Sequence, residues 1–338
     1  MKDKLLEVNN LNVGFSVQGG MLIAVDGINL SVGKKETVCL VGESGSGKTV
    51  TALSIMRLVP KPGVVSAGEI MFSGENLLNV PEERMRALRG AKISMVFQEP
   101  FNCLNPVFRV SEQIGESVEI HLGLKGEEKE NKILEVLKLV GISDEKRVFN
   151  SYPHELSGGM RQRVMIAMGL VSNPALLIAD EPTTALDVTI QAQILELLAD
   201  LKEKLSLSIL LITHDLGIVN EIGDSVYVMY AGRIMEKGRK KAIFSEAKHP
   251  YTEGLLKSVP DLGPVKRRLY TIAGNIPDLT DLPKGCRFHP RCPYVMDVCR
   301  VKDPVETKFS EEHSAWCYRY AGEAREAIEV GEVKNTSK

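Results

Sequence analysis

The segment from Val41 to Thr49, VGESGSGKT, combines glycines with a lysine and a hydroxyl residue at a spacing suited to phosphate chemistry. It follows an apolar run and precedes a helical pattern, as the motif G-x-x-x-x-G-K-[ST] requires. Glycines let backbone N–H groups close around phosphate oxygens, Lys48 can reach the terminal phosphates, and the Thr49 hydroxyl can ligate Mg²⁺. The segment therefore predicts a nucleoside triphosphate site. The residues expected to form it are Gly42, Glu43, Ser44, Gly45, Ser46, Gly47, Lys48, Thr49 and Val50.

Two adjacent carboxylates, Asp180 and Glu181, end an apolar run that begins at Leu176. A carboxylate at the end of a buried strand beside a phosphate loop can hold Mg²⁺ opposite Thr49, and we assign this role to Asp180. Glu181 is placed to orient or deprotonate an attacking water. The alternative is the start of a solvated loop, which the apolar residues before the two acids disfavour.

A second anion-binding pattern, Ser157-Gly158-Gly159, opens another helical segment. Backbone N–H groups at a helix N-terminus attract phosphate. One nucleotide needs only one such cradle, so a second one suggests contact with the γ-phosphate of a nucleotide held by another subunit. Standing alone, the pattern would be an ordinary serine-capped helix.

Strand and helix patterns alternate along the chain and predict an α/β fold around a parallel sheet. The apolar stretches at 93–97 and 209–213, and the stretch at 176–181, which is apolar until the two carboxylates at its end, are typical of central strands covered on both faces. Strand patterns at 5–13 and 25–32 indicate a further β region near the N-terminus.

Together these motifs resemble an ATP-binding cassette (ABC) ATPase over roughly the first 245 residues. The resemblance implies a head-to-tail dimer, in which each ATP lies between the phosphate loop of one subunit and the Leu-Ser-Gly-Gly signature of the other. It assigns Phe15 to adenine stacking, Gln98 to contacts with Mg²⁺ and the attacking water, Asp187 to the D-loop, and His214 to the γ-phosphate. The expected catalytic residues are Glu181, His214 and Gln98, and the expected Mg²⁺ ligands are Thr49, Gln98 and Asp180.

The implied domain organisation has three parts. Residues 1–248 form a P-loop ABC ATPase core with an N-terminal antiparallel β subdomain and an inserted helical subdomain at about 101–170. Residues 249–321 form a small C-terminal extension, and 322–338 a flexible tail.

The extension contains many prolines, so we expect an irregular structure that needs a staple. Its segments His249-Pro250-Tyr251-Thr252 and Gly274-Asn275-Ile276-Pro277 resemble the C-terminal extension of oligopeptide and dipeptide importer ATPases. That resemblance implies an ATPase that powers dipeptide or oligopeptide import. It also narrows the expected partners to two transmembrane permease subunits, a paralogous ATPase (or a second copy of this chain) and, indirectly, a solute-binding protein.

Four of the six cysteines lie in the extension: Cys286, Cys292, Cys299 and Cys317. Tight C-x₂₋₄-C pairs are usual for structural zinc, whereas Fe–S clusters accept irregular Cys₄ spacing, so the spacing leaves zinc and Fe–S open. Some members of the importer group carry a [4Fe–4S] cluster here, which favours that cofactor. His289 and His313 are possible substitute ligands, and Cys39 is expected to be a core residue.

Composition limits the possible classes of function. The net charge of -2 does not support nucleic-acid binding, and no apolar run approaches the roughly 18 residues that span a bilayer. The chain is expected at the cytoplasmic face of the membrane, attached through its partners. The alternatives are an importer ATPase for nickel or another small solute, an ABC ATPase acting on nucleic acid or ribosomes, and a regulatory ATPase with the cysteines as redox sensor.

Overall fold

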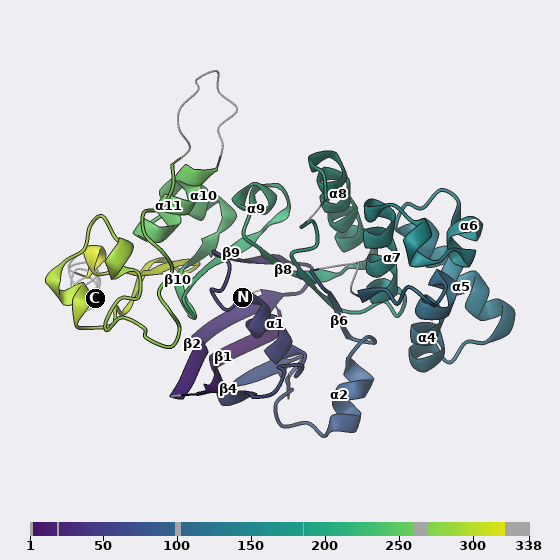
Figure 1. Cartoon of the computed structure of the whole chain (residues 1–338), viewed down its shortest axis with the longest axis horizontal. Helices are drawn as coiled ribbons and strands as arrows, with labels where there is room; N and C mark the ends of the chain where they lie inside the picture. Colours follow the sequence, from purple (N-terminus) through teal and green to yellow (C-terminus); the bar gives the residue numbers. More distant parts are fainter. Residues whose placement is uncertain (1–2, 19, 99–102, 185, 260–269, 322–338) are drawn as a thin grey trace, which may run out of the picture.

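A computed structural model describes residues 3–18, 20–98, 103–184, 186–259 and 270–321 (Figure 1). The predicted flexible tail, 322–338, lies outside the described residues. Within them, no helix has the length and apolarity needed to cross a membrane.

The main sheet contains eight strands in the order β11-β12-β10-β9-β3-β8-β7-β6. From β9 to β6 all neighbours are parallel, and every residue of β3, β6, β7 and β8 is buried. The prediction of continuously apolar central strands is therefore confirmed. The strand bounds are Thr37–Val41 (β3), Ile93–Val96 (β6), Leu176–Asp180 (β7), Ser208–Thr213 (β8), Ser225–Tyr230 (β9) and Arg233–Arg239 (β10).

A second, four-stranded antiparallel sheet, β2-β1-β4-β5, is built from the N-terminal part of the chain. The expected antiparallel β subdomain is thus present. Phe15 lies within β1, opposite Leu22 of β2, rather than between the two strands as the sequence indicated. The strands are Lys4–Val17 (β1), Gly20–Gly33 (β2), Gly63–Phe72 (β4) and Glu75–Asn76 (β5).

Alternating residues of the central strands divide between two hydrophobic cores. Leu176 and Ile178 pack with the N-terminal sheet and α1, whereas Leu177 and Ala179 pack with the helices on the other face. This follows from the two-residue period of a strand. The helices next to the sheet are Lys48–Ile55 (α1), Gly158–Leu170 (α7), Val188–Leu205 (α8) and Leu216–Ile222 (α9).

A helical region lies at one end of the molecule, beyond α7 (Figure 1). It contains Val110–Leu122 (α4), Gly126–Leu139 (α5) and Glu145–Asn150 (α6). The apolar residues spaced at helical intervals, Ile133, Val136 and Leu137, are buried there. A short helix, Glu82–Leu88 (α2), precedes β6.

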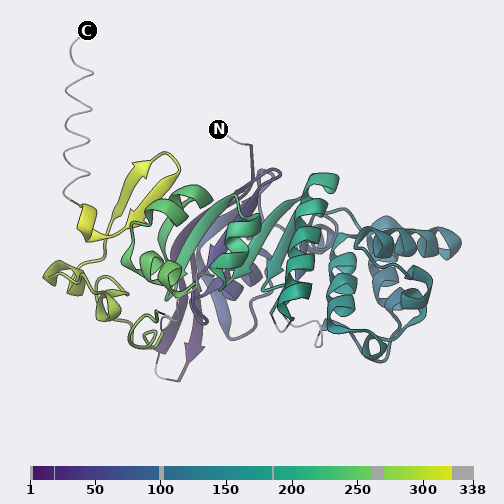
Figure 2. The ribbon, with the colours of Figure 1, turned by 90° about the horizontal axis from the view of Figure 1, so that it is seen from above.

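The C-terminal extension lies at the opposite end (Figure 2). A short helix, Lys240–Glu246 (α10), precedes it. The helices described within the extension are Pro250–Ser258 (α11) and single 3₁₀ turns at 289–291, 297–300 and 318–320. The expectation that it lacks regular sheet was wrong. Glu306–Ser310 (β11) and His313–Trp316 (β12) form a hairpin that pairs with β10. The main sheet is mixed and not wholly parallel, because β10 pairs antiparallel with both β9 and β12. The hairpin covers the edge of β10 that would otherwise leave backbone groups unpaired.

Candidate functional site

The phosphate loop joins the end of β3 to the start of α1, and its backbone requires glycine. Gly47, the residue before α1, has φ +104°. A Cβ atom there would lie 2.4 Å from the carbonyl oxygen of Ala24. The close approach leaves the helix N-terminus and its free N–H groups facing an open cavity, an arrangement suited to phosphate.

That cavity has a volume of about 850 Å³, within the range of small-molecule sites. It brings together Phe15, the phosphate loop, and the ends of three parallel strands. Gly42 and Ser46, also predicted as nucleotide contacts, are not part of its described lining. The lining residues are Phe15, Leu22, Ala24, Glu43, Ser44, Gly45, Gly47, Lys48, Thr49, Val50, Gln98, Glu181, Thr184, His214, Leu255, Ile276 and Leu279.

Lys48 holds a positive charge inside the loop. Its Nζ donates to the carbonyl oxygens of Gly42 (2.8 Å) and Glu43 (3.0 Å). Burial lowers its pKa, and the nearby Glu181, Asp180 and Glu43 carboxylates oppose that shift. The ammonium group therefore lies inside the loop, at the position from which a lysine can contact a bound polyphosphate.

Thr49 and Asp180 meet from α1 and β7. The Thr49 Oγ1 donates to the Asp180 Oδ1 at 3.3 Å, and Asp180 is only 2% exposed. Burial raises the pKa of Asp180, partly offset by the hydrogen bond from Thr49. A hydroxyl and a carboxylate oxygen fit Mg²⁺, a hard cation that prefers oxygen ligands.

Glu181 lies at the centre of a polar cluster. One carboxylate oxygen accepts from Gln98 Nε2 (3.0 Å) and Thr184 Oγ1 (2.9 Å), and the other is 3.1 Å from His214 Nδ1. Gln98, Glu181 and His214 follow β6, β7 and β8, which are neighbours in the sheet. Carboxyl ends of parallel strands share one edge, so these three residues, distant in sequence, come together beside the phosphate loop.

The signature segment lies elsewhere. Ser157 caps α7, its Oγ accepting from the backbone N–H of Met160 at 3.3 Å, and Asp187 caps α8 in the same way by accepting from Ile190. Gly159 approaches Ile190 closely: a Cβ there would be 2.8 Å from its side chain. Ser157, Gly158, Gly159 and Asp187 are absent from the described lining of the cavity.

The four tail cysteines line one small cavity, although they come from separate turns of the extension. Burial raises the pKa of Cys286 to about 12 and of Cys317 to about 11, and also raises that of Cys292. Among the described residues, no group of three or more Cys, His, Asp or Glu side chains is arranged to hold a single metal ion. The described arrangement of the side chains therefore supports neither the zinc alternative nor the expected [4Fe–4S] cluster.

The two histidines considered as substitute ligands differ in position. His289 lines the same cavity as the cysteines, with its Nδ1 3.0 Å from the carbonyl oxygen of Cys286. His313 instead contacts the buried Glu236 carboxylate at 2.8 Å, and it is not among the residues described as lining the cavity. Cys39 is fully buried in β3, as expected for a core residue.

The sequence did not indicate that the C-terminal extension reaches the phosphate loop. Leu255, Ile276 and Leu279 line the nucleotide cavity, and Tyr251 and Arg291 contact Glu43. Of these residues, Tyr251 and Ile276 lie in the two segments, 249–252 and 274–277, that resemble the importer extension. That resemblance did not predict a contact with Glu43. The contact of Tyr251 and Arg291 with Glu43 depends on how the C-terminal extension packs against the cassette.

The fold and the site together define a P-loop ATPase of the ATP-binding cassette type. Comparison of the sequence with known protein families leads to the same class. The sequence matches the ABC transporter family over residues 25–184 and the C-terminal region of oligopeptide/dipeptide transporters over residues 235–299.

Similar proteins cover nearly the whole chain. A Brucella abortus protein named as a peptide import ATP-binding protein is 50% identical over 301 residues, which is 89% of this chain and 91% of the relative. A Brucella ovis protein with the same type of name is 48% identical over 331 residues, covering 94% and 98%. The chain belongs to the ATP-binding proteins of ABC transporters, in the oligopeptide/dipeptide transporter family, and it is an ATPase.

Solved structures agree with the fold. A dimeric ATP-binding cassette in a post-hydrolysis state, bound to ADP and Pi, is 27% identical with a TM-score of 0.63 and covers 70% of this chain and 98% of its own. A component of the cbiONQ transporter complex of Clostridium perfringens is 30% identical with a TM-score of 0.62, covering 72% and 92%.

Proposed function

We propose that this chain hydrolyses ATP to power an importer of dipeptides or oligopeptides. The observation that carries the proposal is the joining, in one chain, of a nucleotide cavity lined by the phosphate loop and Glu181 to a C-terminal region of the oligopeptide/dipeptide transporter type. The relatives described above are named for peptide import. They favour this function over import of nickel or another solute, and over action on nucleic acid or ribosomes.

The proposed roles follow from the geometry of the site. Phe15 stacks on the base, and Lys48 binds the terminal phosphates. Thr49, Asp180 and Gln98 would hold Mg²⁺, which supplies charge neutralisation at the phosphates. Glu181 orients the attacking water and accepts its proton, with His214 beside it at the γ-phosphate.

We further propose that the complete site needs a second subunit. Ser157, Gly158 and Gly159 are placed at the N-terminus of α7, away from the described lining of their own cavity, so they are available to a nucleotide on a partner. Asp187 caps α8 by accepting from Ile190, the residue that Gly159 approaches. A paralogous ATPase is the proposed natural partner, and a second copy of this chain can substitute for it in isolation.

Coupling to two permease subunits would place the chain at the cytoplasmic face of the membrane, with a solute-binding protein delivering peptide from the other side. The segment proposed for this contact, 101–109, follows Gln98. Phe101 lies outside the described residues, but Val107 and Phe108 are 71% and 48% exposed, which suits a docking surface. The division into a core at 1–248, with helical residues at about 101–170, and an extension at 249–321 remains part of the proposal.

The four tail cysteines are proposed to hold a [4Fe–4S] cluster. They line one cavity, and four cysteines at irregular spacing are a ligand set that Fe–S clusters accept. Ligation requires deprotonated thiols, so it would offset the raised pKa values that burial imposes. The cluster would supply a covalent staple for a proline-rich region.

The direct test is substitution of Glu181 by glutamine. We expect kcat to fall at least about 100-fold, because the general base is lost, while ATP binding and dimerisation persist. Thr184→Val, which removes only one hydrogen bond to Glu181, serves as the matched control and should retain most activity. Undiminished hydrolysis by the glutamine variant would refute the assignment of Glu181.

Uptake of labelled dipeptide and of nickel by vesicles containing the permease would identify the substrate class.

A further inference from the structure

Residue Glu43 of the phosphate loop is held on two sides by the C-terminal extension. Its backbone N–H donates to the Tyr251 hydroxyl at 2.9 Å. Its carboxylate accepts two hydrogen bonds from Arg291, at 2.7 and 3.0 Å. The Glu43 carbonyl oxygen also accepts from Lys48. Every polar group of this residue therefore has a partner, and two of the partners, Tyr251 and Arg291, bind the phosphate loop to the extension.

Arg291 is also bonded to the wall of the nucleotide cavity. It donates to the carbonyl oxygens of Ala273 (3.0 Å) and Ile272 (3.3 Å), shortly before Ile276 and Leu279, which line the cavity. Its side chain is only 4% exposed. A planar guanidinium with a fixed fork of donors can bridge these groups simultaneously, which lysine cannot.

The aromatic residues behind Arg291 make this connection rigid. Tyr230, Tyr251 and Phe288 are fully buried and pack against one another, with ring centroids 4.7 to 5.3 Å apart. The Tyr230 hydroxyl also accepts from Arg291 at 3.4 Å. The position of Arg291 is therefore set by the cores of both the cassette and the extension.

Glu43 lines the cavity that must hold a highly negative polyphosphate. An unpaired carboxylate at that position would repel the ligand, and the repulsion would be strong because the surroundings are partly buried. We propose that Arg291 is a positioning residue for ATP: it neutralises Glu43 and fixes the phosphate loop relative to the apolar wall formed by the C-terminal extension. The inference rests on the ATP-binding part of the proposed function.

Arg291→Met tests this through ATP affinity. We expect the Kd for Mg²⁺-ATP, measured by calorimetric titration of the full chain, to rise about tenfold, equivalent to about 1.4 kcal/mol. The KM for ATP should rise similarly, with kcat within about twofold, because Arg291 does not contact the Glu181 cluster. Arg291→Lys, which keeps the charge but loses the fork, should give a smaller loss.

A double variant distinguishes two roles of Arg291: neutralising the charge of the Glu43 carboxylate, and only holding the extension in place. The loss of ATP affinity caused by Arg291→Met should be at least about fivefold smaller when it is measured against Glu43→Gln than when it is measured against the wild type. An equal loss in both backgrounds would overturn the proposal. If Arg291→Met does not fold, Arg291→Lys in the same two backgrounds gives the comparison.

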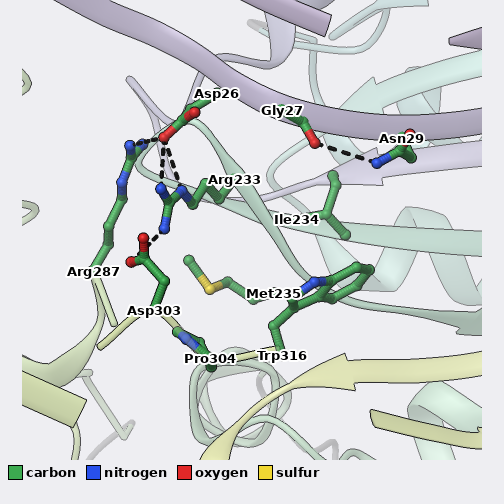
Figure 3. A pocket seen from close by; sticks show the side chains of 10 residues that line it. All are labelled: Asp26, Gly27, Asn29, Arg233, Ile234, Met235, Arg287, Asp303, Pro304 and Trp316. Atoms are coloured by element: carbon green, nitrogen blue, oxygen red, sulfur yellow. Dashed lines mark hydrogen bonds and ion pairs between the residues drawn. The ribbon is translucent and has the colours of Figure 1, made fainter. Parts of the chain in front are cut away.

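Arg287 provides a matched control from the same cysteine segment. It is 6% exposed and pairs with Asp26, next to Arg233 and Asp303, in a separate cavity (Figure 3). Arg287→Met should reduce thermal stability with less than about a twofold change in ATP affinity. An equal loss of affinity in both arginine variants would show general loosening of the extension and overturn a specific role for Arg291. If the wild type itself bound no ATP, the proposed function would fail instead.

Discussion

At the scale of single residues, the site depends on contacts between side chains that are far apart in the sequence. Glu181 is the clearest example, since its partners Gln98 and His214 come from two other strand ends. Its φ of +45° places it where the chain turns out of β7. A non-glycine residue with this backbone conformation is uncommon and is found preferentially at functional sites.

Gly47 permits a prediction about backbone conformation. Gly47→Ala should destabilise the protein by at least about 2 kcal/mol and abolish ATP binding, because the new Cβ meets the Ala24 carbonyl and φ is positive. Gly45→Ala is the control: its φ is +78°, but no atom lies within 4 Å of the added Cβ, so about 1 kcal/mol is expected. Chemical denaturation without nucleotide measures the free energy of unfolding of both variants. An equal loss in the two variants would contradict the explanation based on the Ala24 contact.

His249 predicts a pH dependence of stability. Burial lowers its pKa from 6.5 to about 4, opposed by the Glu236 carboxylate and assisted by Arg319, and its Nδ1 accepts from the backbone N–H of Tyr251. The unfolded chain then binds a proton that the folded chain does not. Stability from this group is full above about pH 6.5 and is lost as the pH falls towards 4, by up to about 3 kcal/mol.

The comparison that isolates His249 uses asparagine, which can accept the same capping hydrogen bond but does not titrate. Denaturation midpoints of the wild type and of His249→Asn should converge as the pH falls from 6.5 to 4. Parallel curves over that range would show that His249 contributes nothing to the acid sensitivity.

At the scale of elements, the extension combines a short hairpin with single turns carrying the four cysteines. Such a region has little apolar core of its own and gains order from covalent or metal links. Its attachment to the cassette is nevertheless extensive, through the β10–β12 pairing and through the arginines on either side of Phe288.

Removal of a proposed cluster ligand tests the role of the extension. Cys299→Ser should abolish bound iron and sulfide and lower the midpoint of thermal unfolding by several degrees, because ligation orders the extension. Cys39→Ser, a substitution at a buried cysteine of β3, should leave the iron content unchanged. Iron analysis and visible absorbance after anaerobic purification are the measurements. Equal iron in both variants would exclude Cys299 as a ligand.

At the scale of the whole molecule, the phosphate loop and the signature helix occupy different places on one chain. If they complete each other only across a dimer, two defective variants should complement. Lys48→Ala and Ser157→Arg should each be inactive alone, and an equimolar mixture should regain a substantial fraction of the activity, since the mixed dimer contains one intact site. ATPase assays across mixing ratios measure this. Absence of recovery, with mixed dimers shown to form, would contradict the composite site.

The sequence by itself determined the phosphate loop, the carboxylate pair, the central strands and the family, because these depend on local spacing and on apolar runs that mark burial. It did not determine that Gln98, Glu181 and His214 form one hydrogen-bonded cluster, that a C-terminal hairpin extends the main sheet, or that Arg291 reaches Glu43. Those features join residues up to 248 positions apart. Such pairings carry no local pattern: they follow from strand order and from the packing of the extension against the cassette, which only the tertiary structure decides.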